Sequence, residues 1–104
     1  MAKLMASVPG GTKLVVDKFA KESKLFSIDT SSILEEHEAI SSIGDIHTTL
    51  TYDNVGTRLG KLLDIRILPI DMGTARQIDA PVSIMFNTTF GSVKELSFVV
   101  RNFV

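Results

Sequence analysis

Apolar and polar residues alternate most regularly in the last quarter of the chain, over residues 81–90 and 95–104. A period of two is the pattern of a half-buried β-strand. The short connection between the two runs, residues 91–94, contains Gly91 and Ser92, as in a β-hairpin. The alternating apolar residues that we expect to share the buried face are Val82, Ile84, Phe86, Leu96, Phe98 and Val100.

Four shorter runs earlier in the chain are also rich in β-branched and aromatic residues. In residues 24–29, Phe26 and Ile28 fall on one face. The remaining runs are residues 12–19, 45–52 and 63–67. Residues 12–20 and 55–63 fit either a strand or a short helix, and the pattern leaves both open.

A helix is predicted over about residues 32–43. Ser32 and Glu35 have the spacing of a capping box at its start, and Gly44 follows its end. The apolar side recurs at helical spacing, through Ile33, Leu34, His37, Ile40 and Ile43.

These elements predict a single α+β domain over residues 1–104. Its core would be a small, mainly antiparallel sheet of about six strands, packed against the one amphipathic helix. Residues 1–11 contain Pro9 and two glycines and are expected to be a flexible or partner-ordered lead-in. Residues 71–80 are expected to form an exposed loop.

Composition limits the classes of protein to consider. Apolar residues make up 44% of the 104, charged residues 22%, and cysteine is absent, which excludes disulfides and thiolate sites. No apolar run approaches the roughly 20 residues of a membrane span, and no signal-peptide pattern is present. A cytoplasmic location, or a virion if the protein is viral, is the resulting expectation.

Charge is distributed unevenly although the net charge is only −1. Residues 1–24 hold five lysines and two acids, whereas residues 29–53 hold six acids and neither lysine nor arginine. These segments either meet within one molecule or face partners of opposite charge.

Motifs for catalysis and for cofactor or metal binding are weak. Glu35, Glu36, His37 and Glu38, with His47 further on, are ligand types for zinc or manganese, but the HExxH motif is absent. Neither the phosphate-loop pattern GxxxxGK[ST] nor the GxSxG elbow occurs. We therefore expect no catalytic, cofactor or metal residues, and keep a small metal-dependent enzyme around His37 and His47 as an alternative.

Single-stranded nucleic-acid binding is a second alternative. Phe19 and Phe26 would offer stacking surfaces beside a basic first hairpin. The lysines that would contact phosphate are Lys13, Lys18, Lys21 and Lys24.

Self-association is the function that the pattern favours. A second set of apolar residues projects to the opposite face of the C-terminal pair of strands, and one helix covers only one face of a sheet. The predicted oligomer interface consists of Phe90, Val99, Arg101, Phe103 and Val104. We therefore expect a non-enzymatic binding or structural module that forms a homo-oligomer or joins a larger assembly, as viral or phage structural and accessory proteins do.

Overall fold

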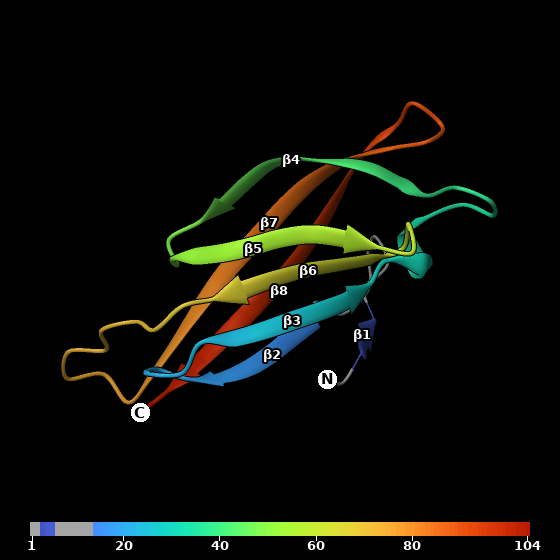
Figure 1. Cartoon of the computed structure of the whole chain (residues 1–104). Coiled ribbons are helices and arrows are strands. Elements are labelled where there is room, and N and C mark those ends of the chain that lie inside the picture. Colours follow the sequence, from blue (N-terminus) through green and yellow to red (C-terminus); the bar gives the residue numbers. More distant parts are fainter. Residues whose placement is uncertain (1–2, 6–13) are drawn as a thin grey trace.

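The computed structural model describes residues 3–5 and 14–104. These residues form eight strands in two four-stranded sheets, packed face to face as a β-sandwich (Figure 1). The strands are β1 (Lys3–Met5), β2 (Leu14–Phe19), β3 (Lys24–Asp29), β4 (Ile40–Thr48), β5 (Tyr52–Arg58), β6 (Leu62–Ile67), β7 (Gln77–Thr88) and β8 (Val93–Phe103).

One sheet has the order β1-β3-β6-β5 and the other the order β2-β8-β7-β4. Strands β1 and β2 pair in parallel with β3 and β8, and every other pairing is antiparallel. If β3 to β8 are lettered B to G, one sheet contains B-E-D and the other G-F-C. This is the strand order of immunoglobulin-like sandwiches. The described residues therefore form an all-β domain.

The core lies between the two sheets. The alternating residues of β7 and β8 that were expected to be buried are at most 1% exposed, which confirms both strands and their inward face. The opposing sheet contributes Phe26, Ile28, Leu63, Ile65 and Ile67, all at most 3% exposed. A second sheet thus covers the face that we had assigned to a helix.

The predicted helix at residues 32–43 is wrong, and with it the α+β class. A single 3-10 turn at Ser31–Ile33 is followed by extended backbone at Leu34 and by β4 from Ile40. The N-cap residue of this turn is Thr30, and Ser32 lies inside the turn, so no helix begins at Ser32. Ile33 and Leu34 still pack against the core, so these apolar side chains are partly buried without forming a helix.

The segments that we left open contain strands and a turn but no helix where the structure describes them, and residues 59–61 form the turn between β5 and β6. Residues 14–19 form β2, and residues 55–58 belong to β5. Strand β5 has a register shift against β6 between Asp53 and Gly56, with Asn54 at a φ of 51°. The shift marks a β-bulge, in which Asn54 adopts the left-handed backbone conformation that asparagine tolerates.

The connection between β6 and β7 covers residues 68–76, so the loop expected at 71–80 is shifted by a few residues. Pro81 lies inside β7 and pairs with Val99 of β8. Strand β4 pairs with β7 only as far as Val82, so Pro81 lies where no second neighbour needs its missing N–H.

Strand β8 lies between β2 and β7 and is paired on both sides. Because both of its edges are occupied, self-association through β8 must use its side chains and not a free strand edge. No helix in the described ranges 3–5 and 14–104 has the length and apolar character of a membrane span.

Candidate functional site: an apolar groove at one end of the sandwich

The outer face of the second sheet carries apolar side chains where β2 runs beside β8. Val15 pairs with Val99, and Phe19 pairs with Phe103. Directly paired residues project to the same face of a sheet. Phe19 is 64% exposed, whereas Val99 and Phe103 are partly buried. This outer face therefore offers apolar surface that the molecule does not cover itself.

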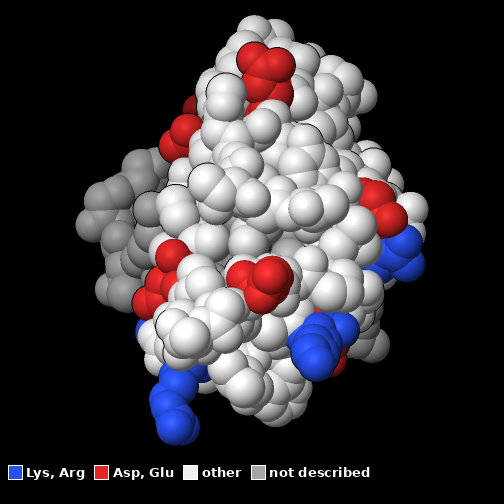
Figure 2. All heavy atoms as spheres, turned by 90° about the vertical axis from the view of Figure 1, so that its left-hand side faces the viewer, with Lys and Arg blue, Asp and Glu red and all other residues white. Residues whose placement is uncertain are grey.

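The apolar surface continues round the end of the sandwich into an open groove of about 690 Å³. We call it the end groove. It lies between the β2–β3 turn, the 68–76 connection and the end of β8, at the left of Figure 1. Figure 2 looks on to this end and shows broad uncharged areas between scattered charged side chains. The lining residues are Phe19, Ala20, Lys21, Pro69, Ile70, Asp71, Met72, Gly73, Phe103 and Val104.

Backbone hydrogen bonds hold the three segments of the end groove together. The N–H of Ala20 donates to the carbonyl of Phe103 at 2.7 Å, and the N–H of Ile70 donates to the carbonyl of Ala20 at 2.8 Å. The N–H of Val104 donates to the carbonyl of Arg76 at 3.2 Å. These hydrogen bonds fix the turns that line the groove relative to the end of β8.

Lys18, a buried lysine near the end of β2, binds the backbone of the β2–β3 turn. Lys18 Nζ donates to the carbonyls of Phe19 (2.8 Å), Ala20 (3.2 Å) and Glu22 (2.8 Å). The side chain is only 2% exposed. Burial lowers the pKa of Lys18, and the charge of Glu22 acts in the opposite direction. Lys18 thus uses its three donors to close the β2–β3 turn.

The lysines predicted to bind nucleic acid do not form one exposed row. Lys18 is enclosed, which corrects its assignment as a phosphate contact, and Lys13 lies outside the described residues. Lys21 is exposed, and Lys24 Nζ donates to the carbonyl of Asp17 at 3.0 Å. The β2–β3 turn also crosses between the sheets, so no first hairpin exists. Phe26, the second stacking candidate, is buried in the core.

The structure divides the predicted oligomer interface into two places. Val99, Arg101 and Phe103 lie on the outer face of β8, and Val104, 78% exposed, follows at the end groove. Phe90 lies in the β7–β8 turn at the opposite end of the molecule (Figure 1). The sequence did not single out Phe19, Ile70 and Met72 for this surface, because they come from turns and strands far from residues 81–104.

Arg101 separates the two apolar pairs of the outer face. It pairs with Asp17 on β2 and Asp79 on β7, and its Nε lies 3.6 Å from Asp79 Oδ1. That separation exceeds hydrogen-bond length, and within the described residues Nε has no hydrogen-bond partner. Because this Nε is itself enclosed, it is a buried donor that lies near the Asp79 carboxylate without a hydrogen bond, and it is not a contact point for a bound molecule.

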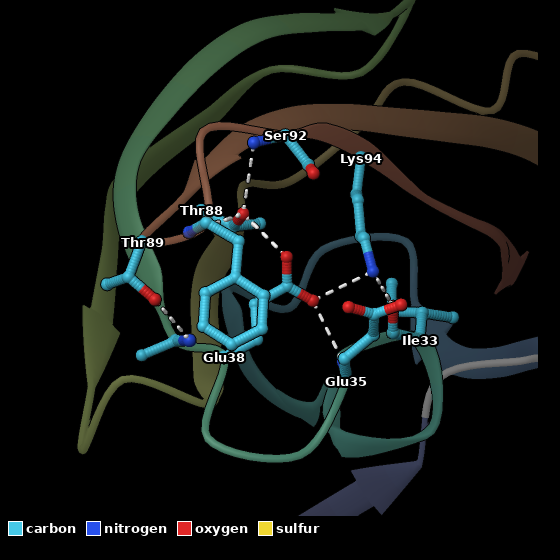
Figure 3. Close-up of polar contacts among 9 residues, drawn as sticks. Ile33, Glu35, Glu38, Thr88, Thr89, Ser92 and Lys94 are labelled. Carbon is cyan, nitrogen blue, oxygen red and sulfur yellow. Dashed lines mark hydrogen bonds and ion pairs between the residues drawn. The ribbon is translucent and has the colours of Figure 1, made fainter.

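The opposite end is organised around a buried carboxylate, Glu38, whose side chain is 1% exposed (Figure 3). Lys94 Nζ donates to Glu38 Oε1 at 2.8 Å, and Thr88 Oγ1 donates to Oε2 at 2.6 Å. The backbone N–H of Glu35 donates to Oε1 at 2.8 Å. Lys94 also reaches the carbonyl of Ile33 at 2.9 Å. These contacts tie the β3–β4 connection to the β7–β8 hairpin.

Hydrogen bonds from Lys94, then Thr88, then the Glu35 backbone lower the pKa of Glu38 to about 2, against the opposing effect of burial. Glu38 therefore stays ionised at neutral pH and serves as the acceptor of the cluster. Sequence reasoning placed it on the solvated face of a helix. Its partners Thr88 and Lys94 lie 50 and 56 residues away, so local spacing carries no signal for them.

The metal alternative gains no support from geometry. His37 and His47 are both exposed, and His37 Nε2 lies 3.6 Å from Glu36 Oε1. His37 was expected on a buried helix face, but it has a φ of 68° in an exposed loop. Within residues 3–5 and 14–104, no group of three or more His, Cys, Asp or Glu is placed to hold a metal ion.

Comparisons with known proteins add little to this picture. No protein-family model matches the chain, and no curated protein matches it. Among solved structures, the chain is similar to mouse clustered PcdhgC3 EC1-3, with a TM-score of 0.44 and 15% sequence identity. The similarity covers 95% of this chain and 33% of that one, so the chain spans about a third of its length. The fold class stated above rests on the strand order, and the site on its own geometry.

Proposed function

We propose that the chain is a non-catalytic β-sandwich module that self-associates through the end groove and the adjoining outer face of β2 and β8. One observation carries the proposal: Phe19, Phe103 and Val104 stand together around an open apolar groove. A groove of this size, lined mainly by apolar groups with few polar ones, has the character of a binding site. Exposed apolar surface of this kind is a feature of protein-interaction sites.

Burial of exposed apolar side chains would supply part of the free energy of association. Burying one large apolar side chain contributes about 1.5–3 kcal/mol, and Phe19 and Val104 are both mostly exposed in the isolated chain. Loss of translational and rotational freedom opposes binding, so contacts beyond these two side chains are needed. Val15 and Val99 on the adjoining outer face supply further apolar area.

The experiment is sedimentation velocity over a wide range of protein concentration. The wild-type mass should rise with concentration, and Phe19→Asp should remain monomeric, because a carboxylate is costly in an apolar interface. A loss of about 2 kcal/mol corresponds to roughly thirtyfold weaker association.

Tyr52→Asp is the matched control, since Tyr52 is a partly exposed aromatic residue on β5, outside the groove. It should associate as the wild type does. A wild-type chain that stays monomeric at the highest concentration would refute the proposal, as would a Phe19→Asp variant with unchanged association.

A further inference from the structure

The exposed large apolar side chains gather at the two ends of the molecule. Within the described ranges there are seven, and Tyr52, which pairs with Ile67 on β6, is not among the residues that line the end groove. Phe19 and Val104 line the end groove, with Val15 on the adjoining face. The other three are Leu59, Phe90 and Val93, 91%, 52% and 62% exposed, and we call them the tip cluster.

The tip cluster is carried by two turns that the β3–β4 connection holds at one end. The N–H of Ile40 donates to the carbonyl of Gly60 at 2.7 Å, beside Leu59. The N–H of Thr89, beside Phe90, donates to the carbonyl of Ala39 at 2.8 Å, and Ala39 N–H donates to Thr89 Oγ1 at 3.0 Å. The Glu38 cluster fixes the same connection to β8. The tip is therefore an ordered surface.

Leu59 is unfavourable in two respects. It has a φ of 56° and Gly60 one of 70°, in a turn closed by the Lys61 N–H and the carbonyl of Arg58 at 3.2 Å. Positive φ at both central residues is the geometry of a type I′ turn, which favours Asn or Gly at the first of them. Leu59 also leaves its apolar side chain in water. Leu59 thus combines an unfavourable backbone conformation with an exposed apolar side chain. This combination points to an interaction with a molecule outside the isolated chain.

The two ends are also complementary in charge. The turns that form the tip, residues 30–39, 59–61 and 89–92, hold two exposed acids, Glu35 and Glu36, and one base, Lys61, whereas the charge of the buried Glu38 is paired with Lys94. The turns at the groove end, residues 20–24 and 68–76, hold three bases (Lys21, Lys24, Arg76) and two acids. Two groove ends brought together would be of like sign, whereas a tip against a groove is not.

We infer that the occupant of the end groove is the tip cluster of a second copy of this chain, so that the molecules associate head to tail. This inference rests on the proposed function and adds the partner surface and the symmetry. The contact is heterologous, because different surfaces of the two copies meet, and each pair of copies keeps one free tip and one free groove. Repetition produces rings or linear chains, depending on the angle between neighbours.

A mixing experiment with two double variants tests the inference. In the tip variant, Leu59→Asn and Phe90→Ser remove the apolar tip. In the groove variant, Phe19→Ser and Val104→Ser remove apolar lining. All four side chains are mostly exposed, so both variants should fold, which thermal unfolding checks. If either double variant unfolds, the single substitutions Phe90→Ser and Val104→Ser replace it.

Each variant alone should show self-association weakened at least tenfold. Mixed, they should form a 1:1 heterodimer that grows no further, since one retains a groove and the other a tip. A tip variant that still self-associates like the wild type, while the groove variant does not, overturns the head-to-tail arrangement but leaves the proposed function standing.

Two monomeric variants that stay separate on mixing also overturn the arrangement. A monomeric wild type, or two variants that both associate as the wild type does, overturns the proposed function itself. The variant Tyr52→Ser serves as the matched control and should not change association.

Discussion

Lys94 Nζ lies 2.8 Å from Glu38 Oε1 and joins two segments that are 56 residues apart in the chain. Thr88, at the end of the neighbouring strand, donates to the other carboxylate oxygen. A buried carboxylate with a charged partner and further hydrogen bonds is costly to disturb from either side. This pair therefore decides how firmly the tip end is held.

Stability should fall in acid because of Glu38. Its pKa is about 2 in the folded chain, against an ordinary value of 4.5. The folded state therefore binds this proton more weakly than the unfolded state does. The resulting stabilisation is complete above about pH 4.5 and is lost as the pH falls towards 2. Urea unfolding at a series of pH values measures this dependence.

The comparison variant is Glu38→Gln, which should be less stable at pH 7 and should vary less between pH 5 and pH 2. Glu36→Gln is the matched control, because Glu36 is exposed. It should leave the acid dependence unchanged. An identical acid profile in wild type and Glu38→Gln would contradict the assignment.

Lys18→Met should destabilise the domain by about 1–3 kcal/mol, because three carbonyl groups lose a charged donor while the apolar stem is preserved. Lys21→Met, three residues further on and exposed, should change stability by no more than about 0.5 kcal/mol. Chemical denaturation of both variants provides the measurement. Equal effects of the two substitutions would show that the β2–β3 turn does not depend on Lys18.

Leu59→Asn should stabilise the isolated chain by about 0.5–1 kcal/mol. Asn tolerates the left-handed conformation of this turn better than Leu does, and the substitution removes apolar surface from water. Thermal unfolding at a concentration where the chain is monomeric should show a higher midpoint. A lower midpoint would mean that Leu59 makes stabilising contacts within its own molecule.

Phe98→Ala should destabilise the fold by about 3–5 kcal/mol, since its ring is fully buried between the sheets. Phe90→Ala makes the same chemical change at a mostly exposed turn position and should cost about 0.5 kcal/mol or less. The difference between the two in urea unfolding tests whether β8 faces the core as described. Similar costs would contradict that orientation.

The strands were predictable wherever one face alone is buried. The period of two correctly identified β7, β8, β6 and β3 and their inward residues, such as Ile84 and Phe98. The division into two sheets was not predictable, because the four residues between β2 and β3 have the composition of a hairpin turn. Only tertiary packing shows that the chain crosses to the other sheet there.

The prediction of a helix over residues 32–43 was wrong because contacts distant in the sequence decide the structure of this segment too. The apolar residues of 32–43 do reach the core, but through an extended segment, because Glu38 finds buried partners and Ile40 joins a sheet. A short helical pattern with serines and glycine near its end is easily outcompeted by such contacts.

The candidate surface was predictable in part. The outward residues of β8, Val99 and Phe103, follow from the same alternation that identified the core. Their neighbours Phe19, Ile70 and Met72 do not, since the fold alone brings them to this end. The interface and the cytoplasmic or virion location stay predictions.

Pro81 bears on how an assembly of this chain would grow. Among the described residues, the part of β7 that precedes Val82 has no partner strand on its outer side, and the ring of Pro81 interrupts its row of backbone donors. An incoming extended segment would find a gap there, so adding a strand to this margin is disfavoured. Further molecules would therefore attach through folded surfaces and not by strand addition. Amyloid-like stacking along this margin is disfavoured for the same reason.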